Sequence, residues 1–271
     1  MLILSCVGAV LATAAATAFQ RSPDTRTALA AAGSVFLGIS TYVATRWLTS
    51  VAFRAWTMTR SVSEALKAEI YLCRTRSGRY AGADRFAQLN AAAVAIEDGA
   101  SEFEAYLAPN LPDGGAAPGE LDQQAYLAAR VSGQASNYFR PTANRYALRA
   151  KHLRIVVVMC GVAATALSAL VAYLSAIPGA GAADLDLAAW VAVLTTVGTA
   201  VAAHISGRRY DFLILTYLTT ARRLESLANE WRSNAQPMDE AAWSTFVQRC
   251  EDVIGATNQS WISKLAQPES G

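Results

Sequence analysis

IVVVMCGVAATALSALVAYLSAI, residues 155–177, is the stretch that determines the fold class of this chain, because it contains no Asp, Glu, Lys or Arg. As an α-helix, a segment of this length rises about 35 Å. The hydrocarbon core of a bilayer is roughly 30 Å thick. The sequence therefore predicts a transmembrane helix over residues 155–177.

Three further stretches lack acidic and basic residues and are long enough to span a bilayer: 2–19, 27–45 and 187–207. The first two are rich in Ala and Thr, so buried helices of a soluble protein are the alternative for them. Either both of these stretches cross the membrane or neither does, because the connection QRSPDTR (20–26) is too short for anything but a hairpin turn. Ala16-Thr17-Ala18 resembles a signal-peptide cleavage site, but no basic n-region precedes it, and we interpret 2–19 as a membrane helix.

The composition indicates a membrane protein with a soluble part. Of 271 residues, 53% are hydrophobic and 16% are charged, and the mean hydropathy is +0.23. The net charge is +2, and no basic run is interleaved with aromatic residues. We therefore expect the lipid bilayer as a partner and no nucleic acid.

The flanks of the spans predict the orientation. Basic residues precede 155–177 and follow 187–207, whereas the connection PGAGAADLD (178–186) has none. By the positive-inside rule the basic ends are cytoplasmic, although Arg21 and Arg26 in the first connection oppose this mildly. Both termini should then lie in the cytoplasm. The basic flanking residues are Arg145, Arg149, Lys151, Arg154, Arg208 and Arg209.

The remaining segments read as helices and loops, without a run of alternating strand residues. The predicted fold is an all-α membrane protein, in which four transmembrane helices form two hairpins that continue into a cytoplasmic helical bundle. We expect four regions: a first transmembrane hairpin (1–53), a cytoplasmic helical region (54–140), a second transmembrane hairpin (141–209) and C-terminal cytoplasmic helices (210–271).

The chain contains an internal echo. A shift of 161 residues places Glu64 onto Glu225 and Glu69 onto Glu230, within a shared pattern E-x-L-x-x-E followed by an apolar residue. The pattern lies at nearly the same distance after the second and the fourth predicted span. This repetition predicts two copies of one unit, with residues 46–72 and 207–233 as equivalent helices.

Two acidic residues occupy positions on helix faces that are otherwise apolar and are expected to be buried. Glu69 lies in the apolar arc of its predicted helix, and Glu230 is its counterpart in the second copy. An unpaired carboxylate in such a position is costly, so we expect Glu69 or Glu230 to pair with a guanidinium such as Arg130. The alternative is a water-filled margin where these acids pair with nothing.

Hydroxyl residues line one face of each of the last two spans. Spacings of three and four residues place them in one stripe per helix, together with small residues. Close helix packing is one interpretation of such stripes. A pore lining needs the same residues, because water must wet the wall without a charge being buried in lipid. The candidate pore-lining residues are Thr165, Ser168, Ser175, Thr195, Thr199 and Ser206.

The sequence contains no recognisable catalytic motif. No Gly-rich phosphate loop follows a strand and no nucleophile elbow is present. His152 and His204 lie far apart, and no two of the four cysteines form a CxxC motif. We therefore predict that the chain is not an enzyme and has no catalytic site, no cofactor and no metal.

Three helical patterns resemble a known family, the SLATT superfamily of bacterial membrane domains that are associated with nucleotide-synthesising SMODS enzymes and nucleotide-sensing SLOG domains. The patterns are W-x3-R-x3-E-x2-K, Y-x3-R-x3-Q-x3-Y and YLTTARRLESLANEW, and the chain resembles a form in which two such units are fused. One departure is that the first span begins at Met1, where a soluble lead-in is expected. The residues of this structural stripe are Trp56, Arg60, Glu64, Lys67, Glu69, Tyr126, Arg130, Gln134, Tyr138, Glu225, Glu230 and Trp231.

The resemblance implies an effector of a nucleotide-signalled bacterial conflict system of the anti-phage type. Such a protein would lie in the inner membrane and oligomerise, forming a pore or disrupting the membrane when triggered. A nucleotide-sensing or nucleotide-synthesising protein is the partner that the resemblance implies. The alternative is a membrane-anchored adaptor or sensor scaffold without a pore.

Overall fold

The computed structural model describes residues 2–17, 23–47, 50–101, 119–177, 187–233 and 239–265. These ranges are helical and contain no strand, which confirms the predicted all-α class for them. The chain divides into two compact units. We call residues 1–49 and 146–211 the hairpin unit, and residues 50–145 and 212–271 the bundle unit.

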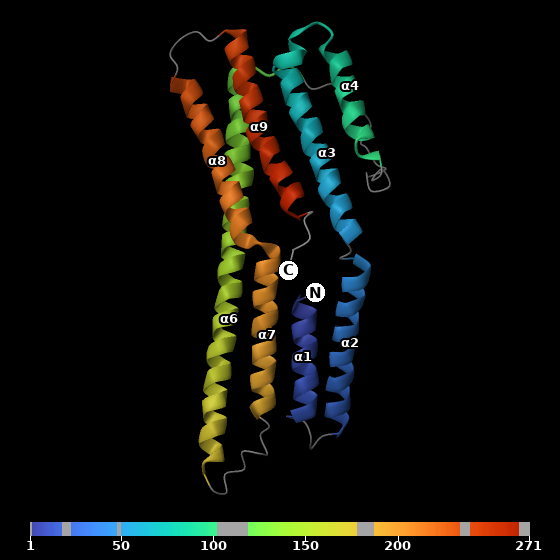
Figure 1. Ribbon diagram of the computed structural model, residues 1–271, viewed down its shortest axis with the longest axis vertical. Helices are drawn as coiled ribbons and strands as arrows, with labels where there is room; N and C mark the ends of the chain where they lie inside the picture. The colour runs from blue at the N-terminus through green and yellow to red at the C-terminus, as the bar shows by residue number, and fades with distance from the viewer. Residues whose placement is uncertain are drawn as a thin grey trace. The chain divides into compact units, whose positions relative to one another are not determined.

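The first helical hairpin of the hairpin unit is formed by α1 (Leu2–Thr17) and α2 (Pro23–Trp47), and α1 also packs against α7 (Figure 1). Gly8 and Gly33 allow the two helices to approach closely. A Cβ added to Gly33 would lie 3.0 Å from the backbone oxygen of Gly8 and 3.0 Å from the backbone nitrogen of Ala12. The hydroxyls of Ser5 and Ser40 hydrogen-bond across the same pair at 2.6 Å.

The second hairpin is formed by α6 (Arg140–Ser175) and α7 (Leu187–Arg208), which run antiparallel. Gly198 of α7 lies against α6, since a Cβ added there would be 3.4 Å from the Cβ of Cys160. Where α7 ends, the rings of Tyr146 and Tyr210 lie 6.0 Å apart. Arg154 donates to both carboxylate oxygens of Asp211, at 2.8 and 2.7 Å.

Two helical stretches, Gln123–Ser175 and Leu187–Ser233, are each long and apolar enough over part of their length to cross a membrane. Large apolar side chains of α6 are exposed, including Val158 at 62% and Met159 at 60%, whereas the core helix of a soluble protein would bury them. The first two predicted spans do not reach this standard. The 16 residues of α1 rise only about 24 Å, and α2 is not among the described helices that are long and apolar enough to cross a membrane. Four transmembrane helices are therefore not confirmed.

The bundle unit begins with α3 (Ser50–Arg74), which packs against the short η1 (Gly78–Ala81), α4 (Arg85–Asp98) and α9 (Glu240–Leu265). Next along the chain come α5 (Gln123–Tyr126), η3 (Leu127–Ser132) and η4 (Gln134–Phe139), followed in the sequence by α6. The last helix before α9 is α8 (Tyr210–Ser233). Trp231, Trp243 and Phe246 form an aromatic cluster between α8 and α9, with ring centroids 4.6 to 5.6 Å apart.

The elements η3 and η4, which follow Asp122 and α5 in the chain, are π-helical. Asp122 caps the start, because its carboxylate accepts the backbone N–H of Ala125 at 2.6 Å. The N–H of Arg140 bonds to the carbonyl of Ala135, five residues back, and the following residue, Pro141, has no N–H to donate. The π-helical turns therefore end next to the proline, which cannot donate the backbone hydrogen bond of an α-helix.

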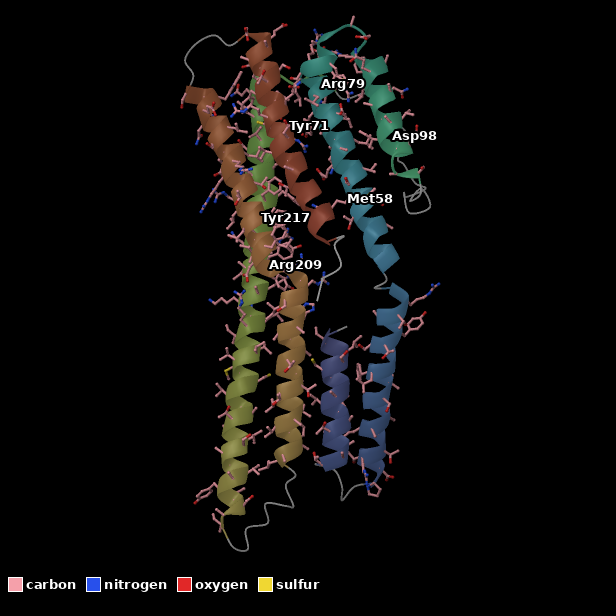
Figure 2. The ribbon with its side chains drawn as sticks, viewed as in Figure 1. Met58, Tyr71, Arg79, Asp98, Arg209 and Tyr217 are labelled. Atoms are coloured by element: carbon pink, nitrogen blue, oxygen red, sulfur yellow. The ribbon has the colours of Figure 1, made fainter. Side chains whose placement is uncertain are left out.

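Helix boundaries repeat with the shift of the sequence echo. α2 ends at Trp47 and α7 ends at Arg208, 161 residues later. The next helices, α3 with 25 residues and α8 with 24, begin at Ser50 and Tyr210. The helix of the second copy is not continuous with its span, because Arg209, labelled in Figure 2, has φ of 48° and separates α7 from α8.

Candidate functional site

The six candidate pore-lining residues are exposed on the surface of the hairpin unit. Three of the hydroxyls, those of Thr165, Ser175 and Thr195, donate to the backbone carbonyl four residues earlier at 2.8 to 2.9 Å. Gly161, which belongs to the same stripe of α6, is exposed as well, and a Cβ added there would meet nothing within 4 Å. The stripes therefore do not lie in the contact between α6 and α7. The exposed hydroxyl residues are Thr165, Ser168, Ser175, Thr195, Thr199 and Ser206.

The two stripes lie on the same side of the second hairpin. Counting about 100° per residue, the hydroxyls of α6 are rotated by about 90° from Cys160, and those of α7 by about 80° from Gly198, in the direction of increasing residue number. Cys160 and Gly198 mark where the helices touch. Because the helices are antiparallel, equal rotations in this direction turn both stripes toward one side. The hairpin thus carries one hydroxyl face, which we define by the six exposed residues above.

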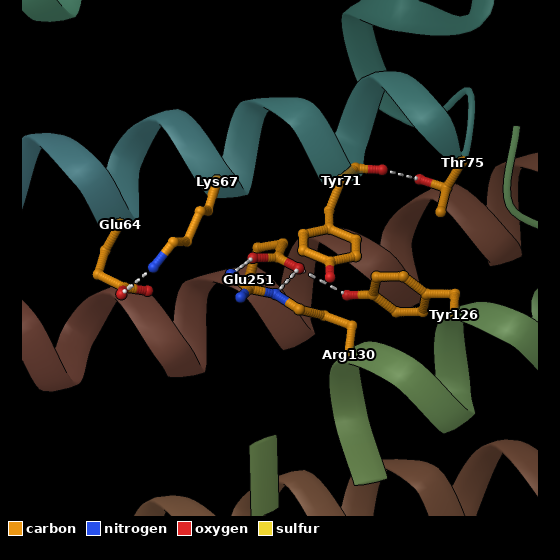
Figure 3. A network of polar contacts seen from close by, with 7 residues as sticks. All are labelled: Glu64, Lys67, Tyr71, Thr75, Tyr126, Arg130 and Glu251. Atoms are coloured by element: carbon orange, nitrogen blue, oxygen red, sulfur yellow. Dashed lines mark hydrogen bonds and ion pairs between the residues drawn. The ribbon is translucent and has the colours of Figure 1, made fainter. Parts of the chain in front are cut away.

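A second polar feature is buried in the bundle unit. The Nε of Arg130 donates to Oε1 of Glu251 at 3.0 Å, and its Nη2 donates to Oε2 at 2.7 Å. Tyr126 donates its hydroxyl to the same carboxylate at 2.9 Å, and the guanidinium lies 4.5 Å from the centre of the Tyr71 ring (Figure 3). Arg130 is 1% exposed and Glu251 is 5% exposed. Every charge in this network has a partner of opposite charge or a hydrogen bond.

Burial and charge act in opposite directions on this network. Burial by itself lowers the pKa of Arg130, but the hydrogen bonds and the negative charge of Glu251 outweigh it, so the pKa is raised. Burial, followed by the charge of Glu251, raises the pKa of Tyr126 far above its usual value. Arg130 is therefore charged and Tyr126 is protonated at every physiological pH.

The predicted partner of Arg130 is wrong. Glu69, instead of meeting Arg130, accepts from Arg79 at 2.6 Å and from the hydroxyl of Tyr80 at 2.5 Å. The cause is the turn after α3, which folds η1 back along the helix; Arg79 lies in this turn, and Tyr71 precedes it on α3 (Figure 2). The expectation that an acid in the apolar arc finds a cation is confirmed for Glu69, but the cation is a local one.

Glu230 also does not reach Arg130. Its carboxylate lies 3.6 Å from Arg249, and both side chains are 55% exposed, so this contact belongs to the surface. Trp231, beside it, packs in the aromatic cluster with Trp243 and Phe246. The second copy therefore turns its acid outward and its tryptophan inward.

The structure brings other members of the predicted stripe together. Arg60 donates to the hydroxyl of Tyr138, which links α3 to η4. Glu64 and Lys67 pair along α3 at 2.9 Å (Figure 3). Glu225 of α8 accepts two hydrogen bonds from Arg140, at 2.7 and 2.5 Å.

The predicted stripe also includes Gln134 and Trp56. Gln134 is half-buried in η4, and the side chain of Trp56 lies outside the described residues. Within the described residues, no group of three or more His, Cys, Asp or Glu side chains could hold a metal ion.

Sequence reasoning missed Glu251. The same signal that singled out Glu69 was available for it, because Glu251 lies between Val247 and Ile254 on the buried face of α9. An acid at the centre of an apolar helical face predicts a buried cation on a neighbouring element. Arg130, which lies beside the buried Val131 in η3, is that cation.

The chain thus combines an apolar antiparallel hairpin with a helical bundle, and comparison with known families matches both parts of the sequence. The family model described as SMODS and SLOG-associating 2TM effector domain 1 matches residues 126–261, half of the chain. The chain belongs to this family of membrane effector domains, as the resemblance predicts. A model described as a protein of unknown function (DUF4231) matches residues 1–87. No curated protein and no solved structure matches the chain.

The two matched segments agree with two fused units. Residues 1–87 contain the hairpin of α1 and α2 followed by α3, and residues 126–261 contain the hairpin of α6 and α7 followed by α8. Together with the two apolar helices, the two-transmembrane family places the chain in a membrane.

Proposed function

We propose that this chain is a membrane effector of a nucleotide-signalled bacterial conflict system, and that its oligomer forms a pore in, or disrupts, the inner membrane when triggered. The observation that carries the proposal is the hydroxyl face, which is exposed and lies on one side of the hairpin. In the proposed arrangement α1 and α2 also cross the membrane, and both termini are cytoplasmic. The effector acts by opening the membrane and not by catalysis.

The hydroxyl face is suited to a wall that is dry in one state and wet in another. Back-bonding to the preceding turn satisfies the hydroxyls of Thr165, Ser175 and Thr195, so the face can rest in lipid at low cost. In an oligomer the same oxygens accept hydrogen bonds from water, without any charge being buried. A scaffold that only anchors the bundle has no need of such a face.

Cysteine accessibility tests the proposal. Ser168→Cys and Thr199→Cys are made in a background without Cys6 and Cys160, and Leu170→Cys serves as the matched control, because it is exposed on the opposite side of α6. A potential-sensitive dye reports when induced expression collapses the membrane potential. Cells are treated with a membrane-impermeant thiol reagent before this collapse and after it.

We expect the Ser168→Cys and Thr199→Cys proteins to react only after the collapse and then to lose conductance, while the Leu170→Cys protein stays inert. If all three are equally inert in both states, the face is a packing surface and the protein is an adaptor or sensor scaffold.

A further inference from the structure

The cytoplasmic flanks of the spans form a collar of basic side chains at one end of the hairpin unit. On α6, Arg149, Lys151 and Arg154 are exposed, and a series of exposed apolar side chains follows from the next residue, Ile155, which is 48% exposed. Arg208 is exposed in the last turn of α7. We define the basic collar as the exposed residues Arg46, Arg149, Lys151, Arg154 and Arg208.

Contacts between the helices place these charges at one level. The ring pair of Tyr146 and Tyr210 and the ion pair of Arg154 with Asp211 hold residues 146–154 of α6 beside the end of α7. The carboxyl end of α2, where Arg46 is exposed, lies at the same end of the hairpin unit as that of α7 (Figure 1).

The collar is poorly neutralised within its own unit. Among the described residues of the hairpin unit, the acids are Asp211, which binds Arg154, and Asp24, in the first turn of α2 at the opposite end. Arg149, Lys151 and Arg208 form no ion pair with another described residue. The connection at the other end, 178–186, contains two aspartates and no basic residue in its sequence.

We propose that the basic collar binds the phosphate groups of anionic phospholipids in the leaflet at this end of the hairpin unit. The positive-inside rule explains how such charges orient a helix during insertion, but it leaves them without counter-charges afterwards. Guanidinium and ammonium groups that directly border an exposed apolar surface lie at the depth of lipid phosphates.

Anionic lipids are favoured over zwitterionic ones for an electrostatic reason. A phosphatidylcholine phosphate arrives with its own cation, whereas a phosphatidylglycerol phosphate carries an uncompensated negative charge. The collar has several basic side chains against the single acid Asp211, so each anionic headgroup relieves repulsion among them. This binding does not depend on whether the hairpin lines a pore.

The test uses the purified full-length chain in neutral detergent and measures its melting temperature with added phosphatidylglycerol, phosphatidylcholine or inorganic phosphate. The collar variant is Arg149→Gln/Lys151→Gln/Arg208→Gln. The matched control is Arg222→Gln/Arg223→Gln/Arg232→Gln, which removes the same charge from exposed positions of α8 in the bundle unit.

Phosphatidylglycerol should raise the melting temperature of the parent by several degrees more than phosphatidylcholine does, and 0.5 M salt, about a 4 Å Debye length, should remove most of the difference. The collar variant should lose most of the shift and the control variant should keep it. The proposal is overturned by equal shifts for both lipids, by an equal shift for inorganic phosphate, or by equal losses in the two variants. The lipid and salt comparison on the parent decides the question if the collar variant does not insert.

Discussion

Arg130 and Glu251, 121 residues apart in the chain, form a two-pronged ion pair that is almost inaccessible to water. The pair joins the π-helical segment η3 to α9, the last described helix of the bundle unit. Tyr126 and Tyr71 complete its surroundings with a hydrogen bond and a ring face. Losing one of the two charges therefore leaves the other buried without its partner.

Replacing Arg130 by Ala should destabilise the bundle unit by about 3–5 kcal/mol, because it leaves the carboxylate of Glu251 buried without its cation. Denaturant unfolding followed by circular dichroism measures the change. Arg249→Ala is the matched control, since Arg249 is 55% exposed and lies 3.6 Å from Glu230, and it should unfold like the parent.

The double variant Arg130→Met/Glu251→Leu separates the two costs. It removes both charges and fills the space with apolar groups, so it should recover most of the stability that Arg130→Ala loses. If Arg130→Ala melts like the parent, the pair is solvated in the folded protein and its burial does not persist in solution.

A glycine in the turn after α3 supports the same unit. Gly78 has φ of 61°, a left-handed conformation, and its N–H donates to the hydroxyl of Ser244 on α9 at 2.6 Å. A Cβ added there would collide with the side-chain nitrogen of Gln248. Gly78→Ala should therefore cost about 1–2 kcal/mol from backbone strain alone.

Gly255 provides the comparison for Gly78. It lies within α9, and a Cβ added there would meet nothing within 4 Å. Gly255→Ala should stabilise the protein by about 0.5–1 kcal/mol, because alanine loses less backbone entropy in a helix. Thermal unfolding of both variants measures the pair of effects, and a shift of the same sign in the two would contradict this account.

Alkaline pH should weaken the turn that holds Glu69. Burial first, and then the hydrogen bond and charge of Glu69, raise the pKa of Tyr80 to about 12. An unfolded tyrosine has a pKa of about 10, so the folded state keeps the proton more tightly. The resulting stabilisation is complete below about pH 10 and is lost as the pH rises towards about 12.

The variant Tyr80→Phe tests this linkage. Its free energy of unfolding should fall less steeply than that of the parent between about pH 10 and 12, measured by denaturant titration at each pH. Part of the fall should remain, because burial also raises the pKa of Tyr126. Identical slopes for parent and variant would show that Tyr80 titrates as in the unfolded chain.

The second hairpin could be predicted from the sequence because its signals are local. The apolar run before Ile177 and the spacing of Thr165 and Ser168 depend only on neighbours along one helix. The exposed position of the hydroxyl stripes could not be predicted, because it depends on which faces α6 and α7 turn toward each other. Gly198 and Cys160 lie against each other in that contact.

The partner of Arg130 lay beyond sequence reasoning for a related reason. Glu69, Glu230 and Glu251 share the same local pattern, an acid on an apolar helical face, and nothing along the chain ranks them. The fold separates them: Arg79 reaches Glu69 first, Glu230 turns to the surface, and Glu251 alone is buried beside Arg130. Tertiary packing thus selects one pair from three equivalent candidates.

Two glycines of the second hairpin separate packing within the chain from contact outside it. Gly198 lies against Cys160, so the branched side chain of Gly198→Val should push α6 and α7 apart and lower the melting temperature of the purified chain. Gly161 lies on the hydroxyl face, and a Cβ added there would meet nothing within 4 Å. Gly161→Val should therefore leave the melting temperature of the resting chain unchanged or slightly changed.

The same variant should nevertheless abolish or reduce the loss of membrane potential on induced expression, because added bulk on the hydroxyl face obstructs either a neighbouring copy or a water path. Normal stability with lost activity would assign the hydroxyl face to the assembled state. Full activity of Gly161→Val, at an expression level matched to the parent, would mean that this face touches lipid in every state and that the membrane is opened elsewhere or not at all.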